Sequence, residues 1–115
     1  MTLNDAGLVV AANAVDAAIT HFQAHSADPG SDGVGFEIGS RTAVGAGTVD
    51  ADGDIAFPAV AFTGLGASVA FWGVSYWTAG SGGTCLGTQA RSGGDANANA
   101  AGAYTYTGTE TGTAT

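Results

Sequence analysis

Residues 68–77, with the sequence SVAFWGVSYW, decide the fold. They are rich in Val, Phe, Trp and Tyr, the β-branched and aromatic residues that favour strands. Both sets of alternating positions are largely apolar, whereas a half-buried strand alternates between apolar and polar positions. We therefore expect this segment to be a central strand that is covered on both faces of its sheet.

Glycine and aspartate signals divide the rest of the chain into short strands. Glycine turns at residues 64–66 and 79–83 bound the central segment, and residues 84–88 return beside it as a short strand. The pair Asp52 and Gly53 is a β-hairpin signal. Four more strands are expected, at residues 20–25, 41–49, 55–62 and 104–107.

The start of the chain has the period of a helix. Leu8, Ala12, Val15 and Ile19 recur at spacings of four, three and four, which places them along one helical face. We expect a helix at about residues 4–19, packed at one side or end of the strands. The helix and one face of the sheet are expected to build the core together.

These elements predict a mainly β fold: a single small β-sandwich or barrel-like domain with one N-terminal helix. The domain is expected to span residues 1–115, with the β part at about residues 20–113. A chain of 115 residues buries about two thirds of its surface on folding, so it needs no metal or disulfide staple. Cys85 is the one cysteine, which excludes an internal disulfide.

The charge balance excludes several kinds of partner. The chain has eight Asp, two Glu, two Arg and no Lys, giving a formal net charge of −8. Binding to a phosphate backbone needs several basic side chains, so nucleic acid and anionic membranes are not expected as partners. No apolar run approaches the roughly 18 residues of a membrane helix. The first residues, MTLND, have no basic stretch, so no signal peptide is expected.

The absence of lysine beside many aspartates favours a hypersaline solvent. At multimolar salt the Debye length falls below about 3 Å, and repulsion among carboxylates largely vanishes. This composition is typical of halophilic archaea and their viruses. The alternative is an acidic protein from a bacterium whose GC-rich genome also favours Ala, Gly and Asp.

Two segments in register resemble a family of small structural proteins of tailed viruses. They are residues 20–30, THFQAHSADPG, and residues 64–87, GLGASVAFWGVSYWTAGSGGTCLG. Family members carry a pattern like T-H-x-x-L-H-T-x-D-P-G-x-x-G and, later, one like P-A-G-T-x-V-x-x-x-G-L-W-x-x-x-x-G-G-T-F-L-G. The resemblance covers roughly residues 3–90, and the chain departs from it where Ala24 replaces Leu and Cys85 replaces Phe. Members are minor tail, fibre or capsid decoration proteins, so the resemblance implies a structural role in a virion.

One acidic turn is a weak candidate for a metal site. Asp50, Asp52 and Asp54 look like the start of a calcium-binding loop, but such a loop needs Gly at its sixth position and Glu at its twelfth. Ile55 and Ala61 stand there instead. We therefore expect a solvated hairpin turn, with an opportunistic cation as the alternative.

The histidines carry no catalytic or zinc-binding signature. His21 and His25 fall in a strand pattern, roughly 13 Å apart, which is too far to share an ion. His25, Ser26 and Asp28 are the residue types of a catalytic triad, but no nucleophile elbow surrounds the serine. We expect structural histidines, no enzyme activity and no cofactor.

Five aromatic residues are candidates for an interface. Aromatic side chains at strand positions serve as core residues or as interface anchors, and they can also stack on sugars. The candidates are Trp72, Tyr76, Trp77, Tyr104 and Tyr106.

The favoured hypothesis is a non-enzymatic virion protein, a capsid decoration or turret protein that assembles as a symmetric oligomer. Its expected partners are copies of itself and the major capsid protein or other virion proteins, with the aromatic residues and the Gly/Thr-rich C-terminal segment at the contacts. One alternative is a minor tail or tail-fibre component. Another is a carbohydrate-binding module that attaches the virus to a host surface glycan. In the favoured hypothesis, dilute buffer loosens the particle, because many acidic copies then repel one another.

Overall fold

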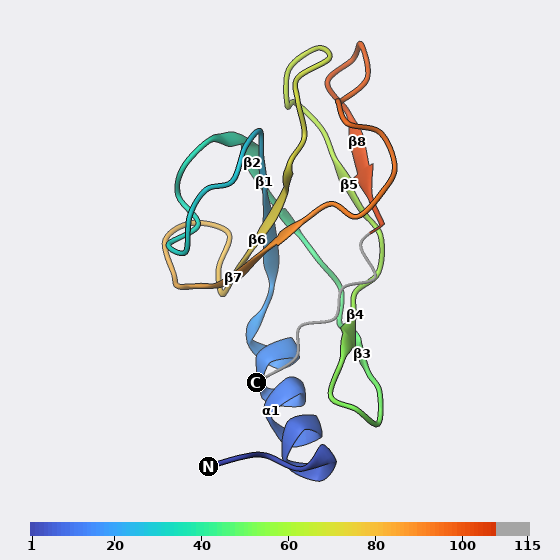
Figure 1. The fold of residues 1–115 in the computed structure, drawn as a ribbon. Helices are drawn as coiled ribbons and strands as arrows, with labels where there is room; N and C mark the ends of the chain where they lie inside the picture. Colours follow the sequence, from blue (N-terminus) through green and yellow to red (C-terminus); the bar gives the residue numbers. More distant parts are fainter. Residues whose placement is uncertain (108–115) are drawn as a thin grey trace.

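The structure is a computed structural model that describes residues 1–107 of the chain. The end of the β domain expected at residue 113, and most of the C-terminal segment expected at contacts, lie outside the described residues. The described elements, drawn in Figure 1, are α1 (Asp5–Ala18), β1 (His21–His25), β2 (Glu37–Ala43), β3 (Thr48–Val49), β4 (Ile55–Ala56), β5 (Val60–Phe62), β6 (Gly73–Trp77), β7 (Cys85–Ala90) and β8 (Tyr104–Tyr106).

Four strands form an antiparallel sheet in the order β2-β1-β6-β7 (Figure 1). β6 is central, because it pairs with β1 on one side and with β7 on the other. Val74 and Ser75 are neighbours in β6 and so face opposite sides of the sheet, and both are fully buried. The prediction of a central strand covered on both faces is therefore confirmed.

The central strand is shorter than the sequence predicts. The ladder starts at Gly73 rather than at residue 68, since Ser68 adopts a positive φ of 55° and Ala70 makes only an isolated bridge, to Asn97. Gly73 fits because it has no side chain: a Cβ there would overlap the carbonyl oxygen of Gln89 on β7.

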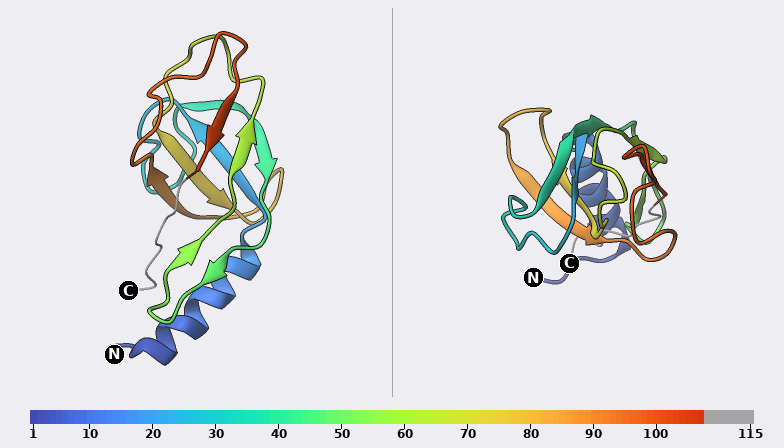
Figure 2. Two further views of the ribbon diagram at one scale, coloured as in Figure 1. Left: turned by 90° about the vertical axis from the view of Figure 1, so that its right-hand side faces the viewer. Right: turned by 90° about the horizontal axis from the view of Figure 1, so that it is seen from above.

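One face of the sheet packs against a second layer. β5 and β8 pair as a two-stranded ribbon that lies over this face (Figure 2, left). The side chains between the layers form the core, in which Phe22 of β1 contacts Tyr76 of β6 with ring centroids 5.0 Å apart. The fold is thus mainly β and sandwich-like with one N-terminal helix, as the sequence predicts.

The opposite face of the sheet is covered by two glycine-rich loops, residues 26–36 and 78–84. Gly33 of the first loop packs over the sheet so closely that a Cβ would lie 2.5 Å from the sulfur of Cys85. Arg41 holds the second loop by donating to the carbonyls of Ala79 and Gly82, at 2.9 and 2.6 Å. Its guanidinium also lies 3.6 Å from the ring centroid of Trp77, in a cation–π contact.

The helix projects beyond the end of the sandwich together with the β3–β4 hairpin (Figure 2, left). Asn4 caps α1 by accepting from the N–H of Gly7 at 3.0 Å. The helix rests on the hairpin, where Asp16 accepts from the N–H of Gly47 at 2.8 Å. Its placement at one end of the strands agrees with the prediction, and so does the hairpin itself.

The expectation that the helix helps to build the core holds only in small part, because Ala12, at 1% exposed, is the one residue of α1 that is buried. The core cluster takes Ile19, the residue that caps the C-terminus of α1, but no residue from within the helix. The reason is geometric, since the helix axis runs away from the sheet and, of the described strands, those of the β3–β4 hairpin lie beside it (Figures 1 and 2). Among the described residues, no helix is long and apolar enough to cross a membrane.

Candidate functional site

A cavity of about 480 Å³ lies beside β8, between that strand and the loop that joins it to β7. In Figure 1 the loop and strand are orange to red, at the far end of the molecule from most of α1. The volume is within the range of small-molecule binding sites, about 300–1,000 Å³. Unlike most such sites, this cavity has a wall rich in charged, amide and hydroxyl side chains.

The charged and aromatic residues of the wall are held in place by the fold. Arg91 donates from Nε to the carbonyl of Phe71 at 3.0 Å. The hydroxyl of Tyr104 donates to the backbone carbonyl of Asp95 at 2.7 Å. The ring of Tyr104 stacks on Phe71, with centroids 3.8 Å apart and planes 9° from parallel.

Two amide side chains of the wall are held in the same way. Asn97 donates from Nδ2 to the carbonyl of Ser68 at 2.9 Å. The Oδ1 atom of Asn99 accepts from the N–H groups of Ala101 and Ala103, both at 2.9 Å. Each amide is therefore oriented by one of its two polar atoms.

The two charges of the wall act on the same phenol. Burial is the main cause that raises the pKa of Tyr104. The negative charge of Asp95 adds to this rise, and the positive charge of Arg91 opposes it. Arg91 and Asp95 are thus both close enough to Tyr104 to act on its phenol, with opposite effects.

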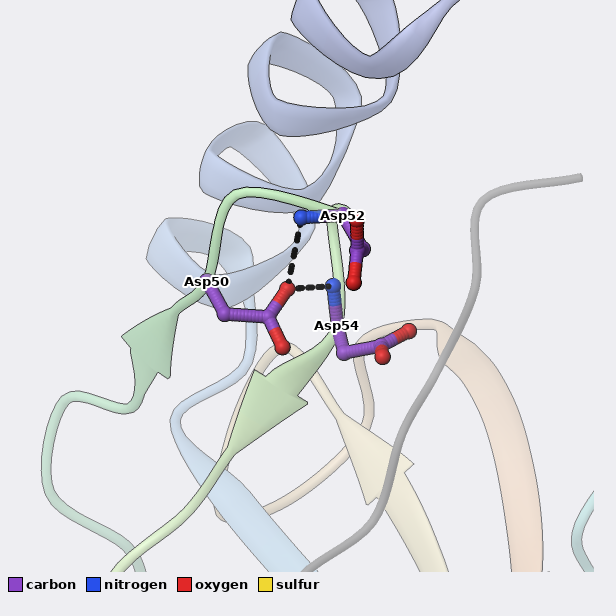
Figure 3. Close-up of side chains that lie close together, drawn as sticks. All are labelled: Asp50, Asp52 and Asp54. Atoms are coloured by element: carbon purple, nitrogen blue, oxygen red, sulfur yellow. Dashed lines mark hydrogen bonds between the residues drawn. The ribbon is translucent and has the colours of Figure 1, made fainter.

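The acidic turn expected between β3 and β4 is present (Figure 3). Asp50, Asp52 and Asp54 place one carboxylate oxygen each within 4.8 Å of the others. The carboxylate of Asp50 accepts from the N–H groups of Asp52 and Asp54, at 2.9 and 3.0 Å. These bonds make an aspartate-capped turn, and it lies in the hairpin where the sequence predicts a turn.

His25 lies in a buried hydrogen-bond chain that the sequence did not reveal. Its Nδ1 lies 2.7 Å from the carbonyl oxygen of Gly35, and its Nε2 lies 2.7 Å from the hydroxyl of Ser75. The indole N–H of Trp77 donates to the same hydroxyl, also at 2.7 Å. Because a carbonyl only accepts, Nδ1 carries the proton, and the hydroxyl of Ser75 donates to Nε2.

This chain of hydrogen bonds is structural. Ser75 and His25 have the spacing of a nucleophile and its base, but both are 0% exposed. The bond to Gly35 fastens the loop of residues 26–36 onto the sheet. Burial lowers the pKa of His25, opposed by the hydrogen bond to Gly35 and the charge of Glu37. The sequence places His25 near Ser26 and Asp28, the residue types of a triad. In the structure, the serine that bonds to His25 is instead Ser75, fifty positions away along the chain.

The interface candidates fall mostly in the core. Trp77, Tyr104 and Tyr106 are 6%, 9% and 4% exposed, whereas Trp72 and Tyr76 are half-buried. Trp77, Tyr104 and Tyr106 are therefore corrected from exposed anchors to core residues, because β6 and β8 turn them inward. Tyr104 and Tyr106 also line the cavity.

The exposed large apolar side chains lie elsewhere. Val10 on α1 is 71% exposed, and Val34 and Phe36 in the loop of residues 26–36 are 52% and 63% exposed. The signal for Val10 was present in the sequence, since the helix segment is apolar on more than one face.

Comparison with known proteins adds no relatives: no family model, no curated protein and no solved structure matches the chain.

Proposed function

We propose that the chain is a non-enzymatic structural protein of a virus particle, a capsid decoration or turret protein that assembles through α1 as a symmetric oligomer. The observation that carries the proposal is the outer face of α1. This helix projects from the sandwich (Figure 2), yet it presents apolar side chains where a surface helix normally presents charges.

The outer face of α1 is a continuous uncharged stripe. Ala6, Val10, Ala14 and Ala17 follow one another at spacings of four, four and three, and all four are exposed. The two carboxylates of the helix are elsewhere: Asp5 lies in the first turn, and the carboxylate of Asp16 is bonded to the hairpin. The outer face therefore offers apolar surface without a charge that would have to be desolvated.

A second copy of the chain is the occupant that the charges favour. Copies that each carry −8 repel one another, so contact is least costly where neither surface bears a carboxylate. Alanine side chains also let two helices approach closely. In a symmetric oligomer each copy uses the same surface, so the stripe of one helix can contact the same stripe of another copy.

The size of the stripe favours several copies over a simple pair. A helix of 14 residues is about 21 Å long, which gives one helix pair less area than the roughly 800 Å² per partner of a standard interface. A ring or bundle adds area, because each helix then contacts two neighbours.

The attribution to a virion depends on the two sequence segments that resemble tailed-virus structural proteins. The stoichiometry of purified particles tests it. We expect the chain in many copies per particle, comparable in number with the major capsid protein. A few copies per particle would support the tail alternative instead, and absence from washed particles would contradict the proposal.

A further inference from the structure

We propose that the cavity beside β8 is a binding site for a neutral saccharide. The inference does not depend on the proposed assembly, because the cavity and the outer face of α1 share no residue. It rests on the polar capacity that the wall residues retain after the fold has fixed them, and on the balance of their charges.

The two asparagines offer complementary groups. Asn97 is anchored through its Nδ2 atom, so its Oδ1 atom remains as an acceptor. Asn99 is anchored through its Oδ1 atom, so its Nδ2 atom remains as a donor of two hydrogen bonds. Groups that are already oriented lose little freedom when a ligand arrives, and this lowers the cost of binding.

The charges point to a ligand without net charge. Arg91 and Asp95 both line the cavity, and their opposite charges have opposite effects on the pKa of Tyr104. Among residues 1–107 the carboxylate of Asp95 accepts no hydrogen bond, and Arg91 uses only Nε of its guanidinium. An anion would meet Asp95 and the net charge of −8, while a cation would meet Arg91.

Adjacent hydroxyl groups match this wall. Each hydroxyl both donates and accepts, so a pair of them can satisfy a carboxylate, a guanidinium or an amide with two hydrogen bonds. Thr105 and Thr107 add exposed hydroxyls to the same wall.

Nuclear magnetic resonance titration of the full chain at high salt tests the proposal. The probes are the methyl glycosides of glucose, galactose and mannose, with glucuronate and glucosamine as charged counterparts. We expect at least one neutral glycoside to bind saturably and to shift amide signals of residues 91–107. The proposal is overturned if no neutral glycoside binds, if a charged sugar binds most tightly, or if the shifts lie elsewhere.

A matched pair of variants assigns the binding to the wall. Asp95→Asn removes a charge without removing the backbone carbonyl that holds Tyr104, and we expect it to weaken binding about tenfold or more, as for a lost charge-assisted hydrogen bond. Asp52→Asn makes the same change in the exposed β3–β4 turn and leaves affinity unchanged. Equal affinities for the two variants would overturn the assignment.

Discussion

The side chain of His25 joins three parts of the molecule through hydrogen bonds of 2.7 Å to Gly35 and Ser75, and onward from Ser75 to Trp77. The arrangement suits only the neutral imidazole. Protonation would put a donor on Nε2, and the hydroxyl of Ser75 would then have to accept from both neighbours and donate elsewhere. Burial of this chain makes that rearrangement costly.

Stability is therefore expected to fall as the pH drops below neutral. The pKa of His25 is lowered by burial, so above its ordinary value of about 6.5 both folded and unfolded chains hold it neutral. Below that value the unfolded chain binds a proton that the folded chain excludes, and folding loses free energy. Urea unfolding at about pH 7.5 and about pH 5.5, above the range of most carboxylates, measures this.

The control for this prediction is His25→Gln, which removes the titrating group. Its unfolding free energy is expected to start lower but to change less over the same pH interval. A wild-type chain that is equally stable at both pH values, or more stable at the lower one, would show that the hydrogen-bond chain accepts a charged imidazole.

Gly73 is the position where the sheet tolerates no side chain. In Gly73→Ala the new Cβ would overlap the carbonyl oxygen of Gln89 and lie 2.8 Å from Cα of Ala90. We expect a loss of about 1–3 kcal/mol, as for an overpacked core site, measured as a lower urea midpoint. Gly93→Ala is the control, since no atom lies within 4 Å of its Cβ; an equal loss in both variants would contradict the packing described here.

The helix α1 is highly exposed and has an apolar outer face. One substitution on that face therefore separates the contribution of the helix to assembly from its contribution to the stability of the chain. Val10 is 71% exposed, so Val10→Ser is expected to change the unfolding free energy of the chain by less than about 0.5 kcal/mol. The same substitution is expected to weaken assembly, because it places a polar group in the middle of the stripe. Sedimentation velocity at high salt measures the loss of oligomer.

Val34→Ser is the matched control for Val10→Ser. Val34 is 52% exposed and lies in the loop of residues 26–36, away from α1 (Figure 1). Assembly is expected to survive this change. If both serine variants assemble like the wild type, α1 is not the contact.

Elements defined by local signals were predictable, and elements defined by distant pairing were not. β6 could be identified because its aromatic and β-branched residues leave no polar face, and the β3–β4 hairpin because Asp52 and Gly53 favour its turn. The ribbon of β5 and β8 could not be, since two three-residue strands far apart in the chain find each other only in the folded core.

The candidate site was predictable only in part, for the same reason. The sequence singled out Tyr104 and Tyr106, but their partners in the cavity wall lie in a segment without periodicity that reads only as a polar loop. The link from His25 to Ser75 depends on which strands are neighbours, and no local spacing carries that information. For α1 the helical period could be seen in the sequence, and one apolar face was expected to pack on the sheet. The second apolar face of the helix, which includes Val10, was not identified from the sequence.

The molecule as a whole is an acidic body, 45 × 27 × 22 Å in extent, with an uncharged helix face at one end and a polar cavity beside β8. Assembly through α1 is expected to require salt, because copies of charge −8 interact over a Debye length of about 10 Å at 0.1 M but only about 3 Å at 1 M. Lowering the salt is therefore expected to dissociate the oligomer, and to loosen particles that contain it. Retention of the protein by particles in dilute buffer without divalent ions would contradict this expectation.

The molar mass of the purified chain at multimolar salt tests the central claim most directly. Light scattering coupled to size-exclusion chromatography is expected to give a whole-number multiple of 11.1 kDa that is constant across the peak and larger than two. A mass of one chain at every concentration would contradict assembly through α1.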